Sequence, residues 1–173
     1  MGEYFKIGKI ASAFGVTGEV IVVHSLGKKT SLKGVEAVFI EDRKDSFLPY
    51  FILSSRLKSD NEVYLQLEGV TSREIATKLL QKEIWLGEEK FKKLVSKSAP
   101  IALLGYQLIN NNDKVGEIIE VIEQPFQVLC KVMIEGKEAL IPIHQETLLN
   151  IDNKKKQVFV SLPDGLLEIY RES

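Results

Sequence analysis

A hairpin with two glycines three residues apart constrains this chain more than any other feature of its sequence. Residues 7–22 place apolar side chains before and after the pattern Gly15-Val-Thr-Gly18, and Val20 and Val22 share one face after it. The pattern predicts strand, tight turn and strand, because glycine tolerates the positive φ that such turns require. The same bare loop suits recognition of a phosphate or of another protein's main chain. A plain structural turn and a recognition loop are both compatible with these residues.

Composition indicates an ordinary globular protein and excludes several classes. The 173 residues are 45% hydrophobic and 27% charged, with a net charge of −1, which argues against disorder and against nucleic-acid binding by bulk charge alone. No apolar run approaches the roughly 20 residues that span a bilayer, and the first residues lack the pattern of a secretory signal. With a single cysteine no internal disulfide is possible, so we expect a cytoplasmic protein without a membrane segment.

Short alternating segments predict an antiparallel barrel in the first half of the chain. Val63, Leu65 and Leu67 fall on one face of the clearest segment, and Tyr64 and Gln66 fall on the other, as in a half-buried strand. Similar segments recur at the spacing of a closed or nearly closed small barrel. The expected strands are residues 4–10, 19–26, 36–41, 48–57, 62–68 and 83–86.

The period then changes to that of a helix. Thr71-Ser72-Arg73-Glu74 is a capping-box pattern, with Thr71 as the capping residue and Glu74 reaching back to it. Residues 88–94 predict a further helical turn, and the leucines of the tail at 164–170 have helical spacing that suits docking on a barrel.

A small polar segment divides the chain in two. Residues 95–100 are Val-Ser-Lys-Ser-Ala-Pro, and the proline disfavours helix before it. We expect a first domain at 1–94, a linker at 95–100 and a second domain at 101–173. The fold class is therefore mainly β, with two small antiparallel β-barrels and a few short helices. The strands expected in the second domain are residues 106–109, 115–122, 128–134, 138–142 and 157–162.

No arrangement of reactive residues predicts catalysis. His24 and His144 are the only histidines and fall in different domains, without Cys or carboxylate at ligand spacing, so we expect no metal site. Cys130 lies in an apolar run and is interpreted as a small buried hydrophobe. We expect no enzymatic activity, no cofactor and no small-molecule substrate.

Three motifs in this order resemble the RimM family of bacterial ribosome maturation factors. The first is Gly-Lys-Ile at 8–10 followed by Phe-Gly-Val-Thr-Gly-Glu-Val at 14–20, and the second is Leu-Glu-Gly-Val-Thr-Ser-Arg-Glu-Ile-Ala at 67–76. The third is a series of segments that is similar to a PRC-barrel domain. Its parts are residues 103–109, 112–118, 128–132, 138–143, 151–152 and 162–167.

The resemblance implies a fold, a function and partners. The family fold is two β-barrels joined by a short linker. Its members are non-enzymatic assembly factors that bind the immature small ribosomal subunit, contact its head ribosomal protein number nineteen and assist folding and processing of the small-subunit rRNA. We therefore expect a cytoplasmic protein, monomeric, with the small subunit, that ribosomal protein and the rRNA as partners.

Two sets of residues are candidates for these contacts. Near the glycine hairpin, a basic rim of Lys9, Lys28, Lys29 and Lys33 is one reading, and ordinary solvated lysines are the other. The candidates for ribosome or rRNA binding are Lys9, Phe14, Gly15, Gly18 and Lys28. The candidates for ribosomal-protein binding are Leu104, Gly105, Tyr106 and Pro142.

The chain departs from the family at one place. Many members carry a Tyr-Tyr pair and an Asp before the second barrel, where this chain has Ser98, Ala99 and Ala102. Tyr106 is a candidate replacement for the lost aromatic anchor. The departure favours an alternative function, a PRC-barrel module that binds another protein without a ribosome role. Phe126 is read as a core residue, and Pro142 as a mark of an edge strand or a strand end.

Overall fold

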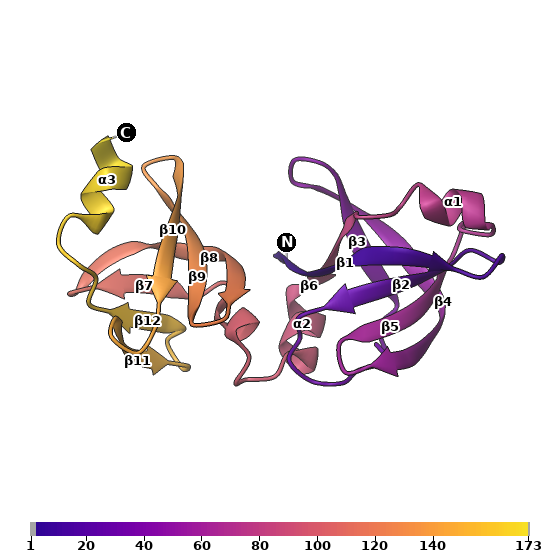
Figure 1. Cartoon of the computed structure of the whole chain (residues 1–173), viewed down its shortest axis with the longest axis horizontal. Coiled ribbons are helices and arrows are strands. Elements are labelled where there is room, and N and C mark those ends of the chain that lie inside the picture. Colours follow the sequence, from indigo (N-terminus) through magenta and orange to yellow (C-terminus); the bar gives the residue numbers. More distant parts are fainter. Residues whose placement is uncertain (1–2, 173) are drawn as a thin grey trace. The chain divides into compact units, whose positions relative to one another are not determined.

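The chain divides into two compact units, Met1–Ala102 and Leu103–Ser173 (Figure 1). This computed structural model describes residues 3–172. Each unit has its own core of buried apolar side chains. Among the described residues, no helix combines the length and the apolar character needed to cross a bilayer.

The first unit is a closed barrel of six strands, and each neighbouring pair is antiparallel. Around the barrel the order is β1-β2-β5-β4-β3-β6. Closure leaves no strand edge unpaired, which protects a small all-β unit from edge-to-edge association. The strands are β1 (Tyr4–Phe14), β2 (Glu19–His24), β3 (Ala37–Arg43), β4 (Ser46–Ser59), β5 (Glu62–Leu67) and β6 (Glu83–Gly87).

Alternation along β5 positions both the core and the outer face of this barrel. Val63, Leu65 and Leu67 are fully buried, whereas Tyr64 and Gln66 are half-buried on the outside. The expected period of two is confirmed, and so is the antiparallel barrel.

The short helix α1 (Arg73–Thr77) follows β5 and begins one residue later than expected. Ser72 has an extended backbone, and its Oγ accepts a hydrogen bond from the Ile75 N–H at 3.2 Å. The prediction of Thr71 as the capping residue was therefore wrong. Ser72 stands three residues before the N–H that it accepts, which is the spacing of an N-cap. Glu74 lies in the first turn, where a carboxylate is favoured by the helix dipole.

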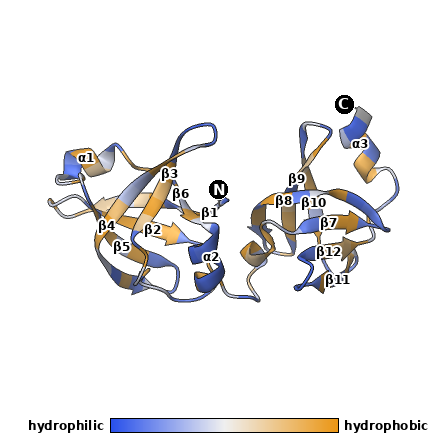
Figure 2. Cartoon of the chain, turned by 180° about the vertical axis from the view of Figure 1, so that it is seen from behind, coloured by the Kyte–Doolittle hydropathy of each residue, from blue (hydrophilic) through white to orange (hydrophobic). Residues whose placement is uncertain are grey.

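The helix α2 (Glu88–Leu94) is held by one aromatic side chain. Phe91 is buried, and its ring lies edge-on to Phe5 at 4.9 Å between centroids. Apart from Phe91 and Leu94, every residue of the helix is charged, and its ribbon is mostly blue in Figure 2.

The segment after α2 is fastened to the first barrel. The Ser96 N–H donates to the Leu26 carbonyl oxygen at 2.8 Å. Ala99 lies so close to Gly27 that a Cβ on that glycine would collide with the alanine Cβ. A 3-10 helix, η1 (Pro100–Leu103), leads into the second unit.

The second unit is a six-stranded sheet in the order β10-β9-β8-β7-β12-β11. Four pairs are antiparallel, and β12 runs parallel to β7. The mainly β fold is confirmed, but the parallel pair and the strand β11 were not expected from the sequence. The strands are β7 (Gln107–Asn110), β8 (Asp113–Gln124), β9 (Gln127–Ile134), β10 (Lys137–Ile143), β11 (Leu148–Asp152) and β12 (Gln157–Val160).

The tail folds back on this sheet as the helix α3 (Leu166–Glu172), as its leucine spacing predicted. Leu167 is buried in the core of the unit, and the Tyr170 hydroxyl donates to the Leu140 carbonyl oxygen at 3.1 Å. Leu140 belongs to β10, which is an edge strand of the sheet. Pro142 lies in the same strand, so its interpretation as an edge-strand residue is confirmed.

Candidate functional site

The β1–β2 turn requires glycine for two different reasons. Gly15 has φ 69° and Gly18 has φ 90°, a region that only glycine enters at little cost. A Cβ on Gly18 would also collide with the Val70 carbonyl oxygen, whereas a Cβ on Gly15 would meet nothing within 4 Å. Gly18 is thus the structural residue of the pair, and Gly15 is open to solvent.

Two polar side chains hold this turn in place from neighbouring segments. Gln66 Nε2 donates to the Thr17 carbonyl oxygen at 3.0 Å and to that of Val70 at 2.7 Å. Arg73, the first residue of α1, donates from Nη1 to the Gly15 carbonyl oxygen at 3.0 Å. The turn is therefore a braced loop, because its main chain is tied to both β5 and α1.

An arginine lies on two aromatic rings beside the turn. The Arg56 guanidinium carbon is 3.9 Å from the centroid of Tyr64 and 5.5 Å from that of Phe14. Glu19 accepts two hydrogen bonds from this guanidinium, each at 3.1 Å. The hydrogen bond with Glu19 raises the pKa of Arg56. The side chain stacks as a fixed cation, which is the form that contacts bases and phosphates.

We call this area the hairpin surface and define it by Phe14, Gly15, Val16, Arg56 and Tyr64. Phe14 is 43% exposed and Val16 is 79% exposed. An exposed aromatic and a stacked arginine beside a bare backbone loop form a small platform on which a base or an apolar side chain can stack.

The structure brings together three of the predicted rRNA-binding residues and separates the other two from them. Phe14, Gly15 and Gly18 lie at the turn. Lys9 pairs with Val23, five residues along β1 from Phe14, which is about 17 Å at the rise of a strand.

Lys28 lies beyond the other end of the hairpin. It follows His24, whose partner Gly8 lies far from the turn, and the neighbouring Lys29 forms an ion pair with Asp60 at 3.4 Å. Lys33 precedes Gly34, whose carbonyl oxygen accepts from Lys90 of α2. The structure therefore favours ordinary solvated lysines over a basic rim beside the turn, because β2 carries the chain back to the opposite end of the barrel.

In the second unit, three of the predicted protein-binding residues form one structural element. Leu104 is buried, and Gly105 has φ 85° and donates from its N–H to the Ile118 carbonyl oxygen at 2.9 Å. Tyr106 is half-buried, and its hydroxyl donates to Asn153 Oδ1 at 2.9 Å. Pro142 is not part of this element, since β8 and β9 separate β10 from β7 in the sheet.

Sequence reasoning missed several surface residues. Phe126 was placed in the core, but it is 96% exposed in the two-residue turn between β8 and β9, so that prediction was wrong. Arg56 and Tyr64 were not singled out. The alternation of β5 already put Tyr64 on the outer face, and this was the available signal for the platform.

Two potentially reactive side chains, Cys130 and His24, are buried. Cys130 is fully buried, and desolvation raises the pKa of its thiol to about 12, so the thiol is protonated and unreactive at neutral pH. His24 is 3% exposed, and burial lowers its pKa. No three His, Cys, Asp or Glu side chains among residues 3–172 are grouped so as to hold a metal ion.

Comparison with known proteins decides the family. Residues 5–91 match the model of the RimM N-terminal domain, and residues 100–166 match that of the RimM PRC barrel domain. The chain belongs to the RimM family. The family relatives include the ribosome maturation factor RimM of Parabacteroides distasonis, 32% identical over 171 residues that cover 96% of this chain and 97% of the relative.

Two further relatives have lower sequence identity to this chain. The ribosome maturation factor RimM of Flavobacterium psychrophilum is 29% identical, with 97% of each chain covered. The crystal structure of a putative 16S ribosomal RNA processing protein RimM from Pseudomonas aeruginosa is 21% identical, with a TM-score of 0.41, and covers 93% of this chain and 98% of that one.

Proposed function

We propose that this protein is a ribosome maturation factor that binds the immature small ribosomal subunit and assists folding and processing of its rRNA. The observation that carries the proposal is the match of both units, in order, to the two domain models of the RimM family. We propose further that it acts in the cytoplasm, as a monomer, by binding and not by catalysis. The buried Cys130 thiol, protonated at neutral pH, is consistent with a binding protein.

On this proposal the hairpin surface contacts rRNA. Arg56 offers a guanidinium already stacked on Tyr64, and Phe14 offers a partly exposed ring. Unstacked RNA bases bind on aromatic rings and arginine planes, and phosphates bind arginine. The braced turn supports such a contact, because a fixed platform loses little entropy when it binds.

The second unit and the linker are proposed to bind the head ribosomal protein number nineteen. Leu104 and Gly105 are fixed by burial and by the main-chain bond to β8, so they orient Tyr106, whose half-buried ring offers an aromatic contact. Pro142 offers a separate contact on the edge strand β10. Ser98 and Ala99 stand where many family members carry the tyrosine pair, and the close fit of Ala99 against Gly27 favours a small side chain there.

The alternative is a module that binds another protein and has no role in ribosome assembly. The observation in its favour is the missing tyrosine pair at Ser98 and Ala99. The two proposals differ in one outcome, which is the capture of immature small subunits by the folded full-length chain.

Co-sedimentation with immature small subunits at low and moderate salt tests the proposed function. We expect Tyr64→Ala to weaken binding roughly five-fold or more, because loss of a stacking ring costs about 1–3 kcal/mol. We expect Arg56→Gln to lower the slope of log affinity against log salt by about one, as for one lost phosphate contact.

The matched control is Lys44→Gln, which removes one exposed positive charge at the β3–β4 turn. It should leave the salt slope unchanged. A parallel pull-down of the head ribosomal protein number nineteen tests the second unit with Tyr106→Ala. If the folded chain captures neither the subunit nor that protein, the alternative module is the better proposal.

A further inference from the structure

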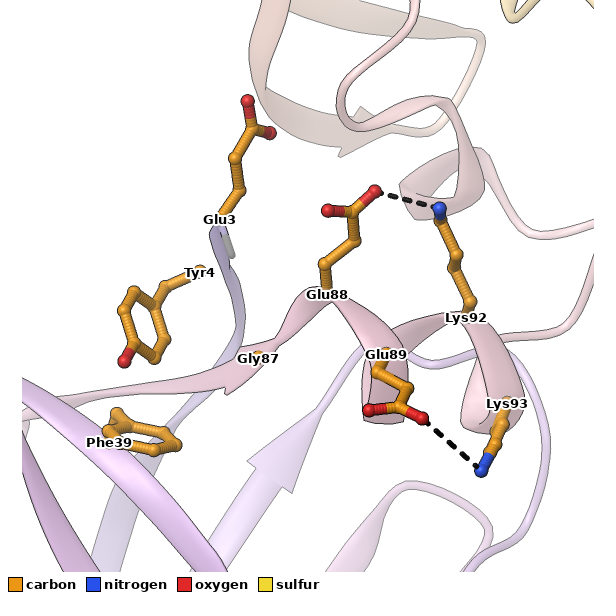
Figure 3. Close-up of a pocket in the computed structure, with 8 residues that line it drawn as sticks. All are labelled: Glu3, Tyr4, Phe39, Gly87, Glu88, Glu89, Lys92 and Lys93. Carbon is orange, nitrogen blue, oxygen red and sulfur yellow. Dashed lines mark ion pairs between the residues drawn. The ribbon is translucent and has the colours of Figure 1, made fainter. Parts of the chain in front are cut away.

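A pocket of about 630 Å³ lies in the first unit, between the start of β1 and the first turn of α2. Its volume is in the range of small-ligand sites, about 300–1,000 Å³. It lies on different elements from the turn of the hairpin surface and from Tyr106. The residues that line it are Glu3, Tyr4, Phe39, Gly87, Glu88, Glu89, Lys92 and Lys93 (Figure 3).

One wall of this pocket is aromatic and held by packing. The Tyr4 and Phe39 rings are 4.6 Å apart and tilted by 55°. Phe47 stacks on Tyr4 at 4.5 Å, and Trp85 packs edge-on to Phe47 at 4.9 Å. The wall is therefore backed by two further rings, so Tyr4 and Phe39 keep their orientation without a ligand.

The opposite wall carries carboxylates. Glu88 forms an ion pair with Lys92 at 2.7 Å, and Glu89 forms a looser one with Lys93 at 3.9 Å. In Figure 3 both lysines lie on the far side of these carboxylates from the aromatic rings. Among the described residues, Glu3 has no ion-pair partner. The lining side chains thus carry three carboxylates against two ammonium groups, and Glu88 and Glu89 lie between the rings and the lysines in Figure 3.

Aromatic faces opposite carboxylates select a cation. A guanidinium fits both walls, because its plane stacks on an aromatic ring while its N–H groups donate to carboxylate oxygens. An RNA phosphate is disfavoured by the same carboxylates. We propose that this pocket binds an arginine side chain of a basic protein partner. The inference is independent of the proposed ribosome role, since it requires only a partner with an exposed arginine.

NMR titration of the full-length chain with a capped Gly-Gly-Arg-Gly-Gly peptide tests the proposal. We expect saturable shifts of the Tyr4 and Phe39 ring resonances and of the Glu88 and Glu89 amides. The same peptide with citrulline in place of arginine keeps the shape and loses the charge, and it should bind at least several-fold more weakly. An oligouridine titrated in the same way is the probe for the other class of macromolecule.

Two sets of variants test whether the arginine peptide binds through the carboxylates and the rings of this pocket. The double variant Glu3→Gln and Glu89→Gln should lower affinity for the arginine peptide by about three- to ten-fold, from two exposed charge contacts. The matched control, Glu74→Gln with Glu123→Gln, removes two exposed carboxylates elsewhere and should leave affinity unchanged.

Tyr4→Leu should abolish the arginine selectivity, and Tyr4→Phe should retain it, with thermal unfolding confirming that both variants fold. Equal binding of the citrulline peptide, insensitivity to the Glu3 and Glu89 changes, or binding of oligouridine at the pocket would each overturn the proposal. These outcomes do not affect the capture of small subunits. The proposed arginine pocket and the proposed ribosome role can therefore be contradicted separately.

Discussion

At the scale of single residues, the two glycines of the β1–β2 turn differ in what a methyl group would meet. We expect Gly18→Ala to lower the free energy of unfolding of the first unit by roughly 1–3 kcal/mol more than Gly15→Ala does. Both changes force alanine into positive φ, but only that at Gly18 adds the collision with the Val70 carbonyl oxygen. Urea unfolding of both variants measures the difference, and equal losses would show that the collision relaxes without cost.

His24 makes the stability of the first unit depend on pH. Its Nδ1 accepts from the Leu26 N–H at 3.2 Å, its Nε2 is buried with no hydrogen-bond partner among residues 3–172, and burial lowers its pKa. Below about pH 6.5 the His24 imidazole therefore binds a proton in the unfolded chain but not yet in the folded chain. We expect stability to be full above that pH and to fall below it by at most about 1.4 kcal/mol per pH unit, until the folded pKa is reached.

Urea unfolding between pH 5 and 7.5 measures this loss. The control is His24→Asn, because asparagine can offer Oδ1 to the Leu26 N–H and does not titrate. Its stability profile should be flatter than that of the wild type. Parallel profiles for the two proteins would assign the acid loss to other groups.

Individual surface residues were harder to predict from the sequence than the core. Regular alternation identified Val63, Leu65 and Leu67 as buried, because burial on one face of a strand leaves a local pattern. The exposure of Phe126 and the distance of Lys28 from the turn leave no such pattern. Both depend on where a hairpin reverses the chain, and that is decided by the register of paired strands.

At the scale of elements, α3 covers part of the edge of the second sheet. Leu167 is 7% exposed and packs in the core, whereas Ile169 of the same helix is 64% exposed. We expect Leu167→Ala to destabilise the second unit by roughly 2–5 kcal/mol, and Ile169→Ala to change its stability by no more than about 0.5 kcal/mol. Thermal unfolding of the two variants makes the comparison, and similar losses would mean that the helix is not docked in solution.

Elements with local signals were predicted, and those with distant partners were not. The hairpin strands and the tail helix follow from short-range periodicity and turn residues. In the parallel pair of β7 and β12, Gln107 pairs with Gln157, which lies far along the sequence. No local sequence pattern predicts such a pairing.

At the scale of the whole molecule, each unit contains a complete core, so the two are expected to unfold separately. We expect fragment 1–102 and fragment 103–173 each to fold, and Leu167→Ala to lower only the transition of the second. Calorimetry of the full chain and of both fragments measures this. A single shared transition that shifts as a whole with Leu167→Ala would contradict it.

The parallel pairing of β7 with β12 also has a consequence for synthesis. The last strand of the first barrel ends at Gly87, so that barrel has all its strands well before translation is finished. In the second sheet, β7 gains its second neighbour only when β12, at Gln157–Val160, has been made. Domains tend to fold as units in the order of their synthesis. We therefore expect the nascent protein to carry a folded first barrel while β7 still lacks one neighbouring strand, until β12 has been made.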